Sequence, residues 1–232
     1  MGCIDGEPEV GDDLDVLPKL ATNALTPAQL MGASFNPTAL NQASVNTYAG
    51  NINGRAALPY VVGCALAAGT SITAYYTAEG GVPMQTTYTG EIGLAPAWKT
   101  TALTVAQQRL ISGCVLARVN ATGVSVTVSL RGPTTALAVT STESTTYVKQ
   151  EGAFFGNIFQ GANFYLAACK GSLATAPTNR RCAQPTGIGT HTECGFAYAG
   201  LCSDMCASGS YFTDCYAPNG VIYDNTVSAY IK

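Results

Sequence analysis

Cysteine clustering near the C-terminus constrains this chain more than any other feature of its sequence. The chain has nine cysteines and a single histidine. Six of the cysteines lie in a stretch rich in Gly, Ser, Thr and Asn: Cys169, Cys182, Cys194, Cys202, Cys206 and Cys215. Cysteine at this density predicts a region cross-linked by disulfides, which persist in oxidising compartments. We therefore expect an extracytoplasmic protein, either secreted or held at the outer membrane or cell surface.

The spacing of these six cysteines favours disulfides over a metal site. The segments between them contain 12, 11, 7, 3 and 8 residues, and the paired C-x-x-C spacing of zinc ribbons is missing from this sequence. Zinc is therefore the minor alternative, and we expect neither a metal nor a cofactor. Six cysteines can pair in many ways, and the sequence does not select one of them.

Two further cysteines occur in similar local sequences. Segments 63–67 and 113–117 read GCALA and GCVLA. A small residue beside each cysteine would let two helices approach until the Cα atoms lie within about 7 Å, as a disulfide requires. We predict a disulfide between Cys64 and Cys114, with two buried free thiols as the alternative.

Apolar periodicity predicts an α+β fold, with buried helices packed on an antiparallel sheet and a small disulfide-rich C-terminal region. Helical spacing predicts helices over 55–68 and 104–120. Alternation predicts a strand over 124–130 with one buried face, and a hairpin is expected over 71–94. Segment 137–142 also has the pattern of a strand. We divide the chain into a flexible acidic tether (1–18), an α+β body (19–165) and a cysteine-rich annex packed on the body (166–232).

Charge is unevenly distributed along the chain. Six of its fourteen acidic residues fall in the first fifteen positions, and from Val16 onward eleven Lys and Arg face eight Asp and Glu. That small, scattered excess of positive charge does not favour a nucleic-acid partner. Apolar runs also fall short of the roughly 18 to 20 residues that cross a bilayer.

The N-terminus resembles the start of a mature bacterial lipoprotein. Gly2 precedes Cys3, and the acidic, Gly- and Pro-containing run 4–15 follows as a tether would. The resemblance implies that Cys3 carries a lipid, which would be the only membrane attachment. The apolar signal segment that precedes the cysteine in such proteins is not part of this sequence. The alternative is a free or cloning-derived cysteine.

Few residues are candidates for catalysis. His191 is the only histidine available as a base for a serine or cysteine nucleophile, and a solvated loop histidine is the competing interpretation. Glycosidase chemistry needs only two carboxylates, and Glu151 has small and aromatic neighbours that would raise its pKa towards use as a general acid. The competing interpretation makes Glu151 an acceptor for backbone N–H groups.

Aromatic side chains among the cysteines suggest recognition instead of catalysis. Exposed aromatic rings on a rigid, cross-linked region suit binding to a glycan or a protein. The candidates among the cysteines are Tyr198, Tyr211, Phe212 and Tyr216. The alternative is that these rings fill the core of the annex.

The body of the chain resembles uncharacterised cysteine-rich secreted lipoproteins of predatory soil bacteria, through segments 60–66 (YVVGCAL), 93–98 (GLAPAW) and 151–157 (EGAFFGN). The resemblance implies location only, because that family supplies no activity to transfer. We expect a binding or structural protein of the cell envelope, with a glycan or an envelope protein as partner and self-association into a surface assembly. The alternative is a secreted carbohydrate-active hydrolase that uses Glu151 with a second carboxylate.

Overall fold

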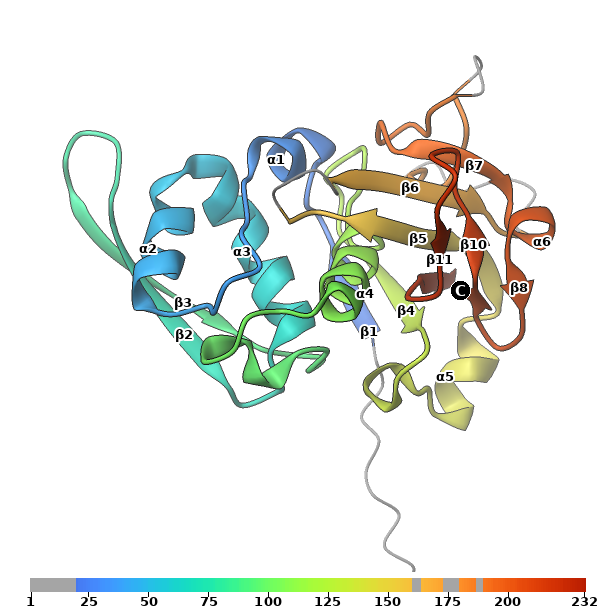
Figure 1. Cartoon of the computed structure of the whole chain (residues 1–232), viewed down its shortest axis with the longest axis horizontal. Coiled ribbons are helices and arrows are strands. Elements are labelled where there is room, and N and C mark those ends of the chain that lie inside the picture. Colours follow the sequence, from blue (N-terminus) through green and yellow to red (C-terminus); the bar gives the residue numbers. More distant parts are fainter. Residues whose placement is uncertain (1–19, 160–163, 173–179, 187–189) are drawn as a thin grey trace, which may run out of the picture.

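The computed structural model describes residues 20–159, 164–172, 180–186 and 190–232, and it confirms the α+β class (Figure 1). Its largest sheet has the strand order β1-β4-β12-β5-β6-β7, and neighbouring strands run antiparallel except for β6 and β7, which are parallel. These strands are β1 (Leu20–Asn23), β4 (Val126–Arg131), β5 (Lys149–Asn157), β6 (Tyr165–Lys170), β7 (Ala197–Leu201) and β12 (Val227–Ile231). Cys3 and the expected tether lie outside the described residues.

Helices and short hairpins surround this sheet. The helices are α1 (Pro27–Gly32), α2 (Gln42–Gly50), α3 (Ile52–Ala65), α4 (Val105–Leu116), α5 (Ser141–Thr146) and α6 (Cys202–Met205), with 3-10 turns η1 (Pro96–Lys99) and η2 (Thr135–Leu137). The hairpins are β2 (Ser71–Thr77) with β3 (Pro83–Thr89), β8 (Ala207–Ser208) with β9 (Phe212–Thr213), and β10 (Cys215–Tyr216) with β11 (Ile222–Tyr223). Among these described helices, none has the length and apolar character to span a bilayer.

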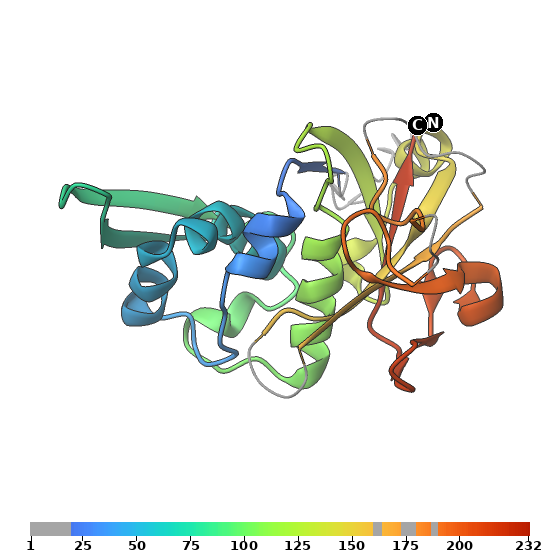
Figure 2. The same ribbon diagram turned by 90° about the horizontal axis from the view of Figure 1, so that it is seen from above.

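Two lobes meet at α4. Figures 1 and 2 show α1–α3 and the β2–β3 hairpin on one side, the large sheet on the other, and α4 between them. Thr104 begins α4 with a capping box, in which its side chain accepts from the backbone N–H of Gln107 and the Gln107 side chain accepts from the backbone N–H of Thr104. This local signal fixes where the central helix begins.

The sheet separates two hydrophobic cores, as strand β5 shows. Phe154 packs with the large core that includes α3 and α4, whereas Phe155 packs with a smaller core on the opposite face. Successive side chains of a strand point to opposite faces, so one strand serves both cores. The smaller core contains Cys169, Cys202 and Cys215 and is closed by the C-terminal hairpins.

Strands from the expected annex complete the sheet of the body. Strand β12 lies between β4 and β5, and β6 and β7 extend the same sheet. The chain beyond residue 165 therefore contributes three strands to the large sheet as well as the layer on one of its faces.

The predicted disulfide between Cys64 and Cys114 is present and joins α3 to α4, with the two Cα atoms 6.1 Å apart. The two glycines do not face the partner helix as expected, because the atoms nearest to each lie outside it. A Cβ on Gly113 would lie 2.8 Å from the Phe154 carbonyl oxygen, and one on Gly63 would lie 2.9 Å from the Glu91 carboxylate. Gly113 thus lets α4 approach the sheet, and Gly63 makes room for an acidic side chain.

Segment 137–142 is not a strand, and that expectation was wrong. The chain forms η2 and then α5, and the side chain of Thr140 accepts a hydrogen bond from the backbone N–H of Glu143 at 3.1 Å. This N-cap stabilises a helix start in a Thr- and Ser-rich stretch whose composition favours a strand.

Strand β4 also differs in detail from the expected alternation. Val128 and Leu130 are buried as predicted, but Ser129 between them is buried too. Strands β1 and β12 flank β4, and the Nε of Arg131 lies 3.4 Å from the hydroxyl of Ser129. The polar face of β4 is therefore covered by protein at this point.

Candidate functional site

All six cysteines of the C-terminal cluster form disulfides. The pairs are Cys169–Cys202, Cys182–Cys194 and Cys206–Cys215. The first links β6 to α6 and the third links the end of α6 to β10, whereas the second belongs to the large core beneath α4. The cross-links thus secure both faces of the sheet.

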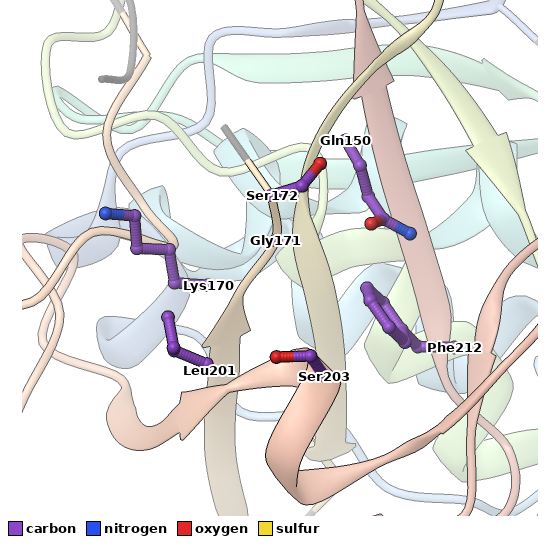
Figure 3. Close-up of a pocket in the computed structure, with 7 residues that line it drawn as sticks. All are labelled: Gln150, Lys170, Gly171, Ser172, Leu201, Ser203 and Phe212. Carbon is purple, nitrogen blue, oxygen red and sulfur yellow. The ribbon is translucent and has the colours of Figure 1, made fainter. Parts of the chain in front are cut away.

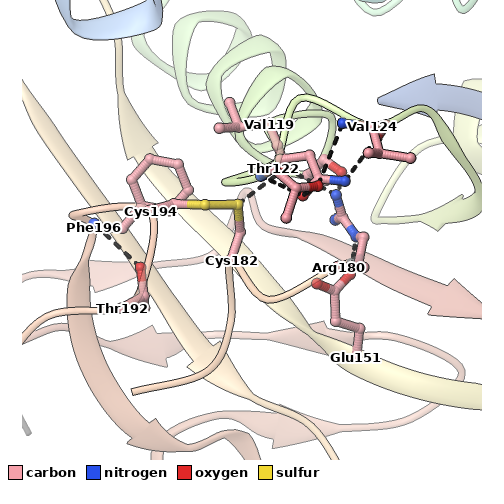
Figure 4. The surroundings of a disulfide bond; sticks show 11 residues. Val119, Thr122, Val124, Glu151, Arg180, Cys182, Thr192, Cys194 and Phe196 are labelled. Atoms are coloured by element: carbon pink, nitrogen blue, oxygen red, sulfur yellow. Dashed lines mark hydrogen bonds and ion pairs between the residues drawn. A yellow bond between two sulfur atoms is a disulfide. The ribbon is translucent and has the colours of Figure 1, made fainter. Parts of the chain in front are cut away.

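Glu151 lies in a buried ion pair with Arg180, drawn in Figure 4. Both side chains are fully buried, and the guanidinium Nε donates to the carboxylate at 2.7 Å. The two other nitrogens of Arg180 donate to the backbone oxygens of Val119 at 2.8 Å and Ala117 at 2.7 Å. A cation here complements the unsatisfied carbonyls that follow the last turn of α4.

This geometry gives Glu151 a structural role. Burial raises the pKa of its carboxyl, and the charge and hydrogen bond of Arg180 oppose that rise. A side chain with no exposed surface does not reach a substrate, so Glu151 does not supply one of two carboxylates facing a cleft. The sequence led us to expect backbone N–H groups as the donors to Glu151. In the structure the donor is the guanidinium group of Arg180.

His191 is exposed on the surface, and its Nδ1 lies 3.1 Å from the hydroxyl of Thr190. Its backbone oxygen accepts from the backbone N–H of Thr186. These contacts belong to a solvated turn, and none of them aligns a nucleophile with the ring.

The four aromatic residues expected to bind a ligand do not share a surface. Phe212 is buried in the smaller core, whereas Tyr216 is 51% exposed on β10. Tyr198 is half-buried on β7, and Tyr211 is half-buried beside Arg131 and Pro133. No ring contact joins any two of these four described side chains.

Two surface hollows lie next to strands β5 and β6. The first, shown in Figure 3, has a volume of about 270 Å³ and lies where β5, β6 and α6 meet. Its lining is mixed: Gln150, Lys170, Ser172 and Ser203 contribute polar groups, and Leu201 and the ring of Phe212 contribute apolar surface. The amide of Gln150 donates to the hydroxyl of Tyr230 at 2.6 Å, so part of the polar lining is already engaged within the protein.

The second hollow, called here the aromatic cleft, is larger and richer in recognition groups. It has a volume of about 370 Å³, and its lining comes from α4, β5, β6 and the β10–β11 hairpin: Val105, Arg109, Asn157, Phe164, Tyr165, Asn219, Val221 and Tyr223. Figure 2 shows the amino-terminal end of α4 and the β10–β11 hairpin towards the same edge of the molecule.

Aromatic and cationic side chains are packed together in the aromatic cleft. The guanidinium carbon of Arg109 lies 4.7 Å from the centre of the Tyr223 ring, and the rings of Tyr223 and Tyr165 are nearly parallel with centres 6.1 Å apart. Arg109 also approaches the carboxylate of Asp224 at 3.8 Å. The stack is ordered by its own contacts and does not depend on a ligand.

Exposed apolar groups and amides complete the aromatic cleft. Phe164 is 47% exposed and Val105 is 52% exposed, so both offer apolar surface at its edge. The amide of Asn157 donates to Gln108 at 3.0 Å, and that of Asn219 lies 3.3 Å from the Tyr223 hydroxyl. Burial raises the pKa of the Tyr165 hydroxyl, and Tyr223 adds to the rise, so this hydroxyl stays protonated at neutral pH.

Sequence reasoning missed the aromatic cleft, because its walls come from segments far apart in the chain. The available signal was the concentration of aromatic residues after position 153, which includes Phe164, Tyr165 and Tyr223. No protein-family model matches the chain, and comparison with curated proteins and with solved structures likewise found no match.

Proposed function

We propose that the protein is an extracytoplasmic, lipid-anchored or secreted binding protein of the cell envelope, and that it binds glycan in the aromatic cleft. The observation that carries the proposal is the combination in one preformed hollow of aromatic rings, a guanidinium group and amides. Four disulfides support the oxidising location. Lipid attachment at Cys3 is part of the proposal.

The lining of the aromatic cleft favours a sugar chain as its ligand. Aromatic and apolar surfaces pack against the C–H faces of sugars, while amides and guanidinium groups hydrogen-bond their hydroxyls. Phe164 and Val105 provide the apolar surface, and Asn157 and Asn219 carry amides with both donors and acceptors. Ordered binding sites of this kind are concave, largely apolar and supplied with a few placed polar groups.

The positions of the carboxylates around the aromatic cleft favour binding over hydrolysis. None of the described residues that line the aromatic cleft is an Asp or Glu, and the nearby carboxylate of Asp224 is the partner of Arg109. Glycoside hydrolysis in most families needs two carboxyl groups across the bond. The aromatic cleft supplies groups that hold a sugar chain and not the acid pair that would cleave it.

The test is binding of purified protein to a panel of bacterial cell-wall and capsule polysaccharides, measured by calorimetry and by co-sedimentation. Phe164→Ala removes an exposed ring of the aromatic cleft and should weaken binding about tenfold, equivalent to about 1.4 kcal/mol. Tyr216→Ala is the matched control, because its ring is similarly exposed but lies outside the aromatic cleft. Its affinity should equal that of the wild type.

Three results would count against the proposal. The first is that no polysaccharide binds, and the second is that both substitutions have the same effect. The third is release of reducing ends from a bound polysaccharide, which would favour the hydrolase instead. The proposal also includes the self-association into a surface assembly that the sequence led us to expect. Light scattering tests it separately, and a monomer at every concentration would contradict it.

A further inference from the structure

Four cysteine sulfurs from two different disulfides form one cluster at the smaller core. The Sγ atoms of Cys169, Cys202 and Cys206 all lie within 4.8 Å of one another, and Cys215 is bonded to Cys206. One contact between the two disulfides joins the Sγ atoms of Cys169 and Cys206, which are 3.6 Å apart although they are not bonded to each other. This distance is within van der Waals contact of two sulfur atoms.

The local fold explains this approach. Cys202 begins α6 and Cys206 follows its last residue, and the backbone N–H of Cys206 donates to the oxygen of Cys202 at 3.0 Å. Residues four apart on one helical turn lie on the same face, so both sulfurs face the same neighbour. That neighbour is Cys169, because the parallel pairing of β6 and β7 sets Lys170 beside Leu201.

Access to the cluster is uneven. Cys169, Cys202 and Cys215 are buried, whereas Cys206 is partly exposed. The sequence neighbours of Cys169 and Cys202 line the hollow of Figure 3 (Lys170, Leu201 and Ser203), but the two cysteines themselves have no exposed surface. An external thiolate therefore meets Cys206 first.

We propose that Cys206 is a thiol–disulfide exchange site whose co-reactant is a dithiol of the kind found in disulfide oxidoreductases. One thiolate of the dithiol attacks the Sγ of Cys206 and the bond to Cys215 breaks, leaving Cys215 as a thiolate that takes up a proton. The second thiolate of the dithiol then displaces Cys206, so that the dithiol becomes a disulfide and the protein gains two electrons.

The freed Cys206 thiolate then moves to the side of the Cys169 Sγ opposite Cys202 and attacks Cys169 in line with the Cys169–Cys202 bond. A bond forms between Cys206 and Cys169, the bond between Cys169 and Cys202 breaks, and Cys202 leaves as a thiolate that takes up a proton. This second step consumes no further reductant. The two-electron-reduced protein is thus a pair of isomers, one with the Cys169–Cys202 bond and one with a Cys169–Cys206 bond and a free Cys202.

The sharpest test needs no reductant. Cys215→Ser leaves Cys206 as a free thiol beside the Cys169–Cys202 bond, and Cys206→Ser is the matched control that leaves Cys215 free instead. Both variants are incubated at mildly alkaline pH, trapped with an alkylating reagent at successive times, and mapped by mass spectrometry of peptides. We expect Cys215→Ser to acquire a Cys169–Cys206 peptide pair together with alkylated Cys202.

The control should keep the Cys169–Cys202 bond and be alkylated at Cys215 alone. Loss of the Cys169–Cys202 bond to the same extent in both variants would overturn the proposal, as would a Cys215→Ser protein that never acquires the Cys169–Cys206 pair. Partial reduction of the wild-type protein with dithiothreitol, trapped and mapped in the same way, provides a second measurement if a variant fails to fold. Its two-electron-reduced fraction must contain the Cys169–Cys206 pair.

Discussion

Replacing Arg180 with methionine tests the buried ion pair directly, because methionine keeps the unbranched apolar stem of the side chain and removes the guanidinium group with its charge. The guanidinium group of Arg180 makes three hydrogen bonds, at 2.7, 2.8 and 2.7 Å, to Glu151 and to two backbone oxygens. Arg180→Met therefore leaves one buried carboxyl and two buried carbonyls without these donors.

The expected cost is large because all of these groups are buried. Removing one partner of a buried ion pair costs about 3 to 5 kcal/mol, most of it from the charge left without compensation. For a chain of this length each kcal/mol lowers the melting temperature by roughly 2 to 4 °C, so Arg180→Met should melt roughly 6 to 20 °C below the wild type. Glu151→Gln keeps an acceptor for Arg180 but leaves its buried guanidinium charge without a counter-ion, so it should also cost about 3 to 5 kcal/mol.

The loss of stability should also depend on pH. Burial raises the pKa of Glu151, and Arg180 opposes that rise. In Arg180→Met nothing opposes it, so the folded-state pKa moves further above the unfolded value of about 4.3. A carboxyl with a raised folded-state pKa contributes its stability below the unfolded pKa and loses it as pH rises through the folded pKa. The free energy of unfolding of Arg180→Met should therefore differ least from that of the wild type near pH 4, and the difference should grow towards neutral pH.

Chemical denaturation of the wild type, Arg180→Met and Glu151→Gln across that pH range measures both effects, with circular dichroism as the signal. Glu151→Gln is the control for the sign, because it has no carboxyl at this position to titrate. A deficit below about 1 kcal/mol for Arg180→Met would refute the reasoning, since an exposed pair costs that little. A deficit that is constant with pH would refute the account of Glu151.

Two further predictions concern the helices. Replacing both Cys64 and Cys114 by alanine opens a disulfide loop with a sequence separation of 50 residues. In the chain-entropy model this should lower the free energy of unfolding by about 4 kcal/mol. Denaturant titration under non-reducing conditions measures the change, and an unchanged midpoint would contradict the prediction. Thr104→Ala removes the capping box of α4 and should cost about 0.5 to 2 kcal/mol, whereas Thr104→Ser, which keeps the hydroxyl, should restore most of that stability in the same titration.

Periodicity and turn residues in the sequence predicted the helices and the hairpin, whose formation depends mainly on residues close together in the chain. The helix around Cys114 and the β2–β3 hairpin were expected from periodicity and turn residues, and both are present. The helix around Cys64 begins earlier than expected, at Ile52, because the side chain of Asn51 accepts from the backbone N–H groups of Asn53 and Gly54. A capping residue shifts a helix boundary without changing the apolar pattern that predicts the helix.

Features that depend on distant segments were out of reach. The pairing of the six clustered cysteines follows from how β6, α6 and β10 are placed in space, and spacing along the chain does not encode that placement. Arg180 is followed directly by a second arginine, Arg181, and nothing in the sequence indicates which of the two is buried against Glu151. The aromatic cleft gathers side chains from α4 to β11 for the same reason.

The central position of β12 has a consequence for how the chain reaches this fold. Residues 227–231 fill the space between β4 and β5, so neither of those strands has its final neighbour on that side until these residues have been made. Pairing over such sequence separations is slow and leaves strand edges open in the meantime. During synthesis the nascent polypeptide therefore exposes the facing edges of β4 and β5 until residues 227–231 emerge.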